Sequence, residues 1–330
     1  MVSHNEVSQT LAIDDREELP TRVSPPPVDP PRGRRRTKPS RWAPWLFLAP
    51  WCIGMLTITL GPMLASLFLS FTDYNLLGRL NWIGLDNYVR MLTDDERFVS
   101  SALVTMQYVL VSVPLQLAFA LAIAVLLNTG LRALPFYRSV YYLPSLLGSS
   151  VAVALLWRQI FGSDGLVNQA LQGLGFEGLP NWIATPEYAL GTLIVLNVWT
   201  FGSPMIIFLA GLRQVPEDLY EAASVDGASW WRKFVSITLP MLSPVIFFNL
   251  VLQMINAFQA FTQAYVVSGG SGGPLDSTLF YTLYLYQQAF TNFNMGYASA
   301  MAWVLLIVIG LFTWLAFGTS KRWVFYAGEK

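Results

Sequence analysis

The sequence is poor in charge and has one cysteine and one histidine. Of its 330 residues, 12% are charged and 54% are hydrophobic, whereas a soluble domain carries about 25% charged residues. Cys52 alone cannot form an intrachain disulfide, and His4 alone excludes a multi-histidine metal site and a Cys/His or Ser/His catalytic pair within the fold. Twenty basic residues balance twenty acidic ones, so no nucleic-acid partner is expected. These deficits predict a polytopic membrane protein.

Long stretches of the chain contain no charged residue at all. Crossing the hydrocarbon core takes about 20 apolar residues in a helix, and six stretches are long enough. We therefore expect an all-α protein with six transmembrane helices, at roughly 43–67, 102–128, 139–159, 189–211, 237–264 and 298–318. The stretch 277–297 is also uncharged, but four Gln and Asn residues interrupt it. We interpret it as a partly buried external segment.

The basic residues are distributed unequally between the two sides that six spans create. Sixteen Lys and Arg fall on the side of the two termini, and four fall on the other side: Arg79, Arg90, Arg97 and Arg158. Because cytoplasmic loops carry an excess of Lys and Arg, both termini are predicted to be cytoplasmic.

The two ends of the chain differ in composition from the membrane domain, which is expected to cover 42–325. Residues 1–41 are acidic, then proline-rich, then basic, and are predicted to be a disordered cytoplasmic tail. Residues 326–330 are predicted to be a short cytoplasmic tail. The basic cluster at 32–41 has two interpretations: it binds anionic membrane lipid, or it only anchors the orientation.

The predicted spans lack the groups that usually supply energy. None contains Asp, Glu or His, which weakens the hypothesis of an ion-driven carrier, although sodium coupling can use carbonyl groups alone. None of the four lysines follows a glycine, so the chain has no Gly-Lys phosphate-binding loop. If this protein pumps a solute, another subunit must supply the energy.

An acidic cluster at 94–96 is the one candidate metal site. Asp94, Asp95 and Glu96 lie beside Arg97 on the predicted external side, and no second acidic motif faces them. A solvated helix end explains the cluster better than a metal site. No catalytic residue and no metal ligand is therefore predicted.

The segment between the fourth and fifth predicted spans carries the strongest local signals. Pro216 and the two acidic residues that follow it are typical of a helix start. Gly227 permits a left-handed turn that would end this helix. Two tryptophans then suit a second helix at the membrane interface. The pattern predicts an exposed amphipathic helix within 216–232, which is suited to docking a partner.

The same segment resembles the loop motif of ABC importer permeases. Seven positions match at the family's spacing: Glu221, Ala222, Ala223, Gly227, Ile237, Leu239 and Pro240. A chance match would occur at a frequency on the order of 10⁻⁶. The stretches 141–144, 258–274 and 296–300 resemble the carbohydrate-uptake permeases of the maltose type, and the resemblance covers roughly 43–325. The glycine-rich run 269–273 is longer than is usual in that family.

The resemblance implies a fold, an assembly and a set of coupling residues. The fold is the maltose-type permease fold in a bacterial cell membrane. In that family a second permease, two cytoplasmic ATPases and an external sugar-binding protein complete the importer, and the ATPases bind ATP, so this chain needs no cofactor. The implied ATPase-coupling residues are Glu221, Ala222, Ala223, Asp226, Gly227, Ile237, Leu239 and Pro240.

Amide side chains form a stripe along the fifth predicted span. At about 100° per residue they share one side of a helix, and polar residues within a membrane should face the bundle interior or a water-filled path. Neutral donors and acceptors also suit sugar hydroxyls. The predicted substrate path consists of Asn249, Gln253, Asn256, Gln259 and Gln263, with Asn197 from the fourth span. Weaker candidates are Thr105, Ser112, Gln116, Ser203, Phe258, Phe261 and Tyr265. Interhelical hydrogen bonding is the alternative explanation of the stripe.

Two other functions remain open from the sequence. One is a permease of the same superfamily for a non-sugar solute such as a glycerol phosphate ester, which a basic residue on the path would favour. The other is an ion-coupled secondary carrier.

Overall fold

The computed structural model describes residues 43–325, apart from 77, 79 and 129–133. Within these ranges every regular element is a helix, and one isolated bridge pairs Thr72 with Trp82. The all-α class is thus confirmed. The predicted tails at 1–41 and 326–330, and Arg79 and Arg132 from the count of basic residues, lie outside the described residues.

The chain divides into two compact units, one ending at Gly54 and the other beginning at Met55. The first unit contains α1 (Ala43–Gly54). The second contains η1 (Met55–Leu60), α2 (Gly61–Leu69), α3 (Asp86–Thr93), α4 (Glu96–Leu127), α5 (Leu134–Leu147), α6 (Val151–Ile160), α7 (Leu166–Gly173), α8 (Pro186–Trp199), α9 (Gly202–Leu212), α10 (Glu217–Val225), α11 (Trp230–Lys233), η2 (Phe234–Thr238), α12 (Leu239–Phe258), α13 (Thr262–Val267), η3 (Pro274–Asp276), α14 (Tyr281–Tyr286), η4 (Gln287–Thr291) and α15 (Met295–Trp323).

The described helices provide four candidate membrane spans, or six if each of two bent helix pairs is one span. Four are long and apolar enough by themselves: Trp45–Leu69, Glu96–Leu127, Trp230–Val267 and Met295–Trp323. The pairs α5–α6 and α8–α9 each qualify as one span with a bend, of 95° and 42° respectively. These six candidate spans lie where the sequence predicts them, but the third and fourth are bent at breaks and the fifth is interrupted at 259–261. The described stretch 277–297 forms no helix long enough to cross, as predicted.

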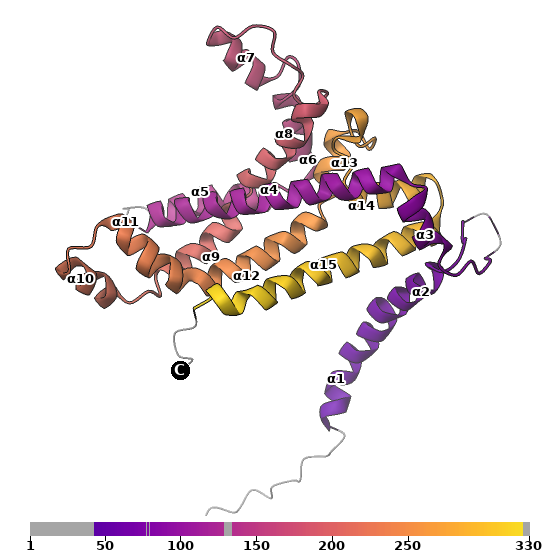
Figure 1. The fold of residues 1–330 in the computed structure, drawn as a ribbon, viewed down its shortest axis with the longest axis horizontal. Coiled ribbons are helices and arrows are strands. Elements are labelled where there is room, and N and C mark those ends of the chain that lie inside the picture. Colours follow the sequence, from indigo (N-terminus) through magenta and orange to yellow (C-terminus); the bar gives the residue numbers. More distant parts are fainter. Residues whose placement is uncertain (1–42, 77, 79, 129–133, 326–330) are drawn as a thin grey trace, which may run out of the picture. The chain divides into compact units, whose positions relative to one another are not determined.

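Helix α4 is the centre of the second unit and packs against α8, α9, α12 and α14 (Figure 1). Its buried positions recur every three or four residues and include small and polar side chains: Ser101, Thr105, Ser112, Gln116, Ala120 and Ala124. Small residues let neighbouring helices approach closely in a membrane, where lipid is as apolar as leucine. Close packing rather than hydrophobicity therefore distinguishes the inward face of α4.

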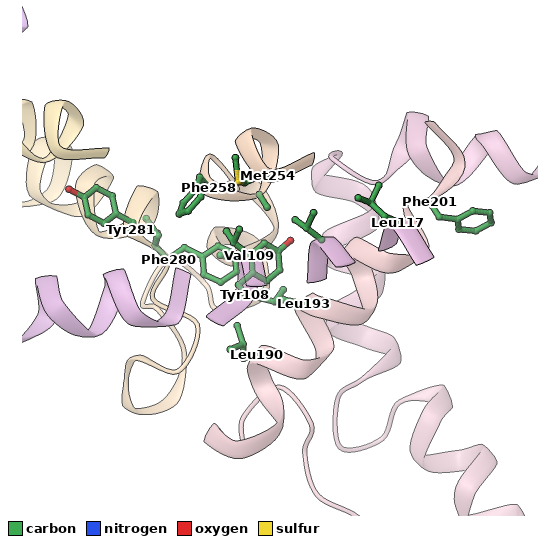
Figure 2. Close-up of a cluster of buried hydrophobic side chains, with 14 of the residues drawn as sticks. Tyr108, Val109, Leu117, Leu190, Leu193, Phe201, Met254, Phe258, Phe280 and Tyr281 are labelled. Atoms are coloured by element: carbon green, nitrogen blue, oxygen red, sulfur yellow. The ribbon is translucent and has the colours of Figure 1, made fainter. Parts of the chain in front are cut away.

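A cluster of apolar side chains surrounds the middle of α4 (Figure 2). It joins α4 to α8, α12 and α14 through Tyr108, Val109, Leu117, Leu190, Leu193, Met254, Phe258, Phe280 and Tyr281. The rings of Tyr108 and Phe280 lie 4.6 Å apart. Dispersion contacts of this kind are individually small and collectively large. They hold the four helices in fixed positions around the polar cavity described below.

The acidic cluster at 94–96 begins α4. The Asp95 carboxylate accepts hydrogen bonds from the Phe98 backbone N–H at 2.9 Å, the Tyr284 hydroxyl at 2.7 Å and the Tyr297 hydroxyl at 2.6 Å. The predicted solvated helix end is confirmed for Asp94 and Glu96, which are exposed, whereas the half-buried Asp95 is hydrogen-bonded to two tyrosines. Burial, with the hydrogen bond to Asp95, raises the pKa of Tyr284 to about 12, so this hydroxyl remains a donor. Among the described residues no group of three His, Cys, Asp or Glu side chains could hold a metal.

Candidate functional site

A polar cavity lies where three spans are interrupted. Helix α5 is separated from α6 at 148–150, α8 from α9 at 200–201, and α12 from α13 at 259–261. The cavity has a volume of about 370 Å³, and all three breaks contribute to its lining. Non-helical backbone at membrane depth is tolerated only where it is buried in protein or lines a water-filled cavity. The breaks and the cavity therefore belong to one feature.

The lining of this cavity is polar and uncharged. Its side chains come from α4, α5, α8, α9, α12, α13 and the breaks between them. The polar members are Tyr108, Gln116, Ser145, Ser149, Asn197, Thr200, Ser203, Gln253, Asn256, Gln259, Thr262 and Gln263, and Phe261 adds an aromatic ring. No Asp, Glu, Lys, Arg or His is among the described lining residues. Such a set offers neutral donors and acceptors, which suit hydroxyl groups.

Thr200 is the centre of the hydrogen bonds that stabilise the break between α8 and α9. Its backbone carbonyl accepts from Ser145 Oγ at 2.7 Å, and its side-chain Oγ1 accepts from Gln116 Nε2 at 3.0 Å. Asn197 Nδ2 donates to Gln116 Oε1 at 3.4 Å. The bond from Ser145 satisfies a backbone carbonyl that a continuous helix would pair internally. Gln116 and Asn197 thus line the cavity and also stabilise the break between α8 and α9 in its wall.

Three amides of the predicted stripe have uncommitted hydrogen-bonding groups. Gln253, Asn256 and Gln259 line the cavity, and their side chains make no hydrogen bond to any part of the chain that the structure describes. Gln263 lines it from α13 and donates to the Gly148 carbonyl at 3.2 Å. The three free amides can therefore bind a solute without breaking an internal bond.

Asn249 lies apart from the cavity, against the prediction that it lines the path. It is fully buried in α12, and its Nδ2 donates to the Val245 carbonyl of the same helix at 3.1 Å. Asn249 and Gln253 lie one turn apart in the uninterrupted helix α12, and the part of α12 that lines the cavity begins at Gln253. The straight helix assumed over 237–264 is interrupted further along the chain, at 259–261. The carbonyl of Ala260 in this break accepts a hydrogen bond from Thr282 Oγ1.

The weaker candidates separate into two groups. Gln116, Ser203 and Phe261 line the cavity. Thr105 does not, because its Oγ1 accepts from the Tyr281 backbone N–H at 2.8 Å. The remaining three, Ser112, Phe258 and Tyr265, are also outside the lining.

Sequence reasoning missed Tyr108, Ser145 and Thr200 as lining residues. A signal exists for one of the breaks, since Gly148 and two serines interrupt the third predicted span. Gly and Ser in such a run favour a turn.

The segment after the fourth span forms α10 and then a sharp turn at Gly227 (Figure 1). No residue of α10 is buried. Gly227 has φ of +73°, and the Ala228 N–H donates to the Ala223 carbonyl at 2.9 Å, as in a Schellman motif. A Cβ at Gly227 would meet nothing within 4 Å. The left-handed conformation, not a close approach, thus requires glycine here.

The motif residues fall into two groups on either side of this turn. On the α10 side Ala223 is half-buried, whereas Glu221, Ala222, Asp226 and Gly227 are exposed. The second group, Ile237, Leu239 and Pro240, is half-buried at the start of the fifth span. The motif therefore joins an exposed surface to the base of a membrane helix.

Comparison with known proteins decides the family. Residues 91–323 match the family described as binding-protein-dependent transport system inner membrane component. The chain belongs to this family. The permease is 52% identical to the probable ABC transporter permease protein YesP of Bacillus subtilis (strain 168), over 92% of this chain and 98% of that protein. It is 34% identical to the lactose transport system permease protein LacF of Rhizobium radiobacter, over 84% of this chain and 94% of that protein.

A solved structure shows that the fold is shared. The permease matches a chain of the bacterial alginate ABC transporter, crystallised in complex with an alginate pentasaccharide-bound periplasmic protein. The TM-score is 0.72 at 23% identity, over 85% of this chain and 94% of that chain. The expected ABC importer permease fold is therefore confirmed, and the protein is a multi-pass membrane protein.

Proposed function

We propose that this permease forms one half of the translocation path of an ATP-driven importer of sugars or oligosaccharides. The observation that carries the proposal is the uncharged cavity at three helix breaks, into which Gln253, Asn256 and Gln259 present free amides. Sugars offer many hydroxyls, which such amides can bind. Relatives named for lactose, arabinooligosaccharide and trehalose/maltose transport support this substrate class.

The importer includes further subunits in this proposal. A second permease completes the path, two cytoplasmic ATPases hold the ATP, and an external sugar-binding protein delivers the solute. This chain carries out no catalysis and holds no cofactor. Bacterial relatives support a location in the bacterial cell membrane, and the excess of basic residues on one side supports cytoplasmic termini.

The proposed mechanism is alternating access. Closure of the ATPases moves α10, the motion reaches the fifth span, and the cavity opens to one side and then to the other. A glycerol phosphate ester is a poorer substrate for this arrangement, because no described residue of the cavity carries a positive charge.

Uptake of labelled sugar into vesicles with the reconstituted importer tests this function. Gln253→Leu removes a free amide from the lining, so we expect uptake at low sugar concentration to fall roughly two- to tenfold. Thr192→Val is the matched control, since the Thr192 hydroxyl bonds to its own helix and lies outside the cavity. Equal uptake by both variants would remove the cavity from the path.

The orientation has its own measurement. On a Cys52→Ser background, a membrane-impermeant maleimide applied to intact cells should label Ser271→Cys and not Ser229→Cys. The reverse pattern would invert the topology.

A further inference from the structure

We propose that the hydrogen bond between Tyr220 and Thr238 is the link that carries movement of α10 into the fifth span. The Tyr220 hydroxyl and Thr238 Oγ1 lie 2.9 Å apart. Neither residue belongs to the motif positions that the sequence matches. The inference rests on the proposed function, in which an ATPase moves α10, and it names the residues that transmit the motion.

Helix α10 has few connections to the rest of the molecule. None of its residues is buried. Among the described residues, two side-chain hydrogen bonds join α10 to other elements, and both lead to the helical segment that begins at Trp230. One is Tyr220 with Thr238, and the other runs from Lys233 Nζ to Ser224 Oγ at 2.6 Å. The side-chain hydrogen bonds of α10 therefore lead to the first residues of the fifth span.

The two hydrogen bonds differ in their surroundings. Thr238 is buried, with 5% of its surface exposed, whereas Ser224 lies on the exposed side of α10. An exposed hydrogen bond is readily replaced by bonds to water, whereas a buried one is costly to leave unmade. The hydrogen bond between Tyr220 and Thr238 is thus the more costly of the two to break.

A second cavity lies beside the hydrogen bond between Tyr220 and Thr238. It has a volume of about 270 Å³, and its lining includes Tyr220, Thr238, Val125 and Leu212. Tyr220 and Thr238 thus border the same cavity as the ends of α4 and α9.

The position of Thr238 connects the link to the substrate cavity. Thr238 is the last residue of the π-helical turn η2, and α12 starts at the next residue. Short π-helical turns within helices frequently occur at functional sites. Helix α12 in turn carries Gln253 and Asn256 to the cavity. A displacement of Thr238 is therefore passed along one helix to the free amides.

Substitutions at both ends of the bond test the inference in vesicles that contain the reconstituted importer. The measurements are ATPase retention on the purified permease and the amount of sugar imported per ATP hydrolysed. Tyr220→Phe and Thr238→Val should each lower import per ATP roughly three- to tenfold, the factor expected for one lost hydrogen bond. The ATPase should remain bound in both. Thr238→Ser keeps a hydroxyl and should restore the ratio, and Ser224→Ala should change it less than twofold.

Measurements on the double variant and on the wild type distinguish failure of this inference from failure of the proposed function. Tyr220→Phe with Thr238→Val should be no worse than either alone, because both remove the same bond. A wild-type ratio in both single variants, additive losses in the pair, or loss of the ATPase from Tyr220→Phe would overturn the inference. If the wild-type permease itself retains no ATPase, the proposed function fails instead.

Discussion

The loop around α10 and the cavity between the spans bring their residues together in different ways. The loop is one continuous segment, and its turn is fixed by Gly227 and backbone hydrogen bonds within six residues. The cavity is assembled from six helices and three breaks that lie far apart in the sequence. A site built from one segment is encoded by local spacing, whereas an assembled site depends on where distant helices stop.

The largest expected effect is at the local site. Gly227→Val places a β-branched residue at φ of +73°, which costs at least roughly 1–2 kcal/mol in that conformation. The helix end should shift, and ATPase retention should fall more than tenfold while membrane insertion is unchanged. Gly227→Asn tolerates the left-handed conformation and is the control. Normal retention of the ATPase by the valine variant would show that the turn is dispensable.

A smaller effect is expected at a glycine of the assembled site. A Cβ on Gly202 would lie 2.8 Å from the Tyr142 Cα, so alanine there must push α9 away from α5. We expect Gly202→Ala to destabilise the permease by about 1–3 kcal/mol and to lower its melting temperature. Gly191→Ala is the control, because a Cβ there would meet nothing within 4 Å. Equal melting temperatures would contradict the close packing at this break.

The smallest effect is expected at Asn249, which belongs to the predicted stripe but does not line the cavity. Its Nδ2 bonds to its own helix, and its Oδ1 has no hydrogen-bond partner within the described residues. Asn249→Leu should therefore leave uptake within twofold of wild type and cost little stability, since one buried acceptor is removed. A loss of uptake as large as that of Gln253→Leu, with the melting temperature unchanged, would restore Asn249 to the path.

The sequence was sufficient to predict the six spans and the loop, because both depend on local properties. Charge gaps mark the spans, and the acidic helix start with Gly227 marks α10. The resemblance to ABC importer permeases depended on that same loop. These features can be recognised in the sequence without knowing which helices are neighbours.

The cavity could be predicted only in part, for a physical reason that the break at 259–261 illustrates. No Gly or Pro occupies 259–261, so nothing in the segment itself predicts that α12 ends at Phe258. The Ala260 carbonyl is satisfied instead by Thr282, which lies 22 residues later in the chain. The stripe placed Gln253 and Asn256 correctly, but helical spacing alone does not show that the cavity ends at Gln253 along α12, so Asn249 was included. The contributions of Ser145 and Thr200 likewise depend on contacts between distant segments.

Protection of single cysteines by the transported sugar tests the central claim most directly. On a Cys52→Ser background, Asn256→Cys and Asn249→Cys would be treated with a small thiol reagent in the assembled importer, with and without the sugar and its binding protein. If the cavity is the path, the sugar should slow labelling at Asn256→Cys several-fold and leave the rate at buried Asn249→Cys unchanged. Equal labelling rates at Asn256→Cys with and without a sugar that the same preparation imports would contradict the assignment of this cavity to the path.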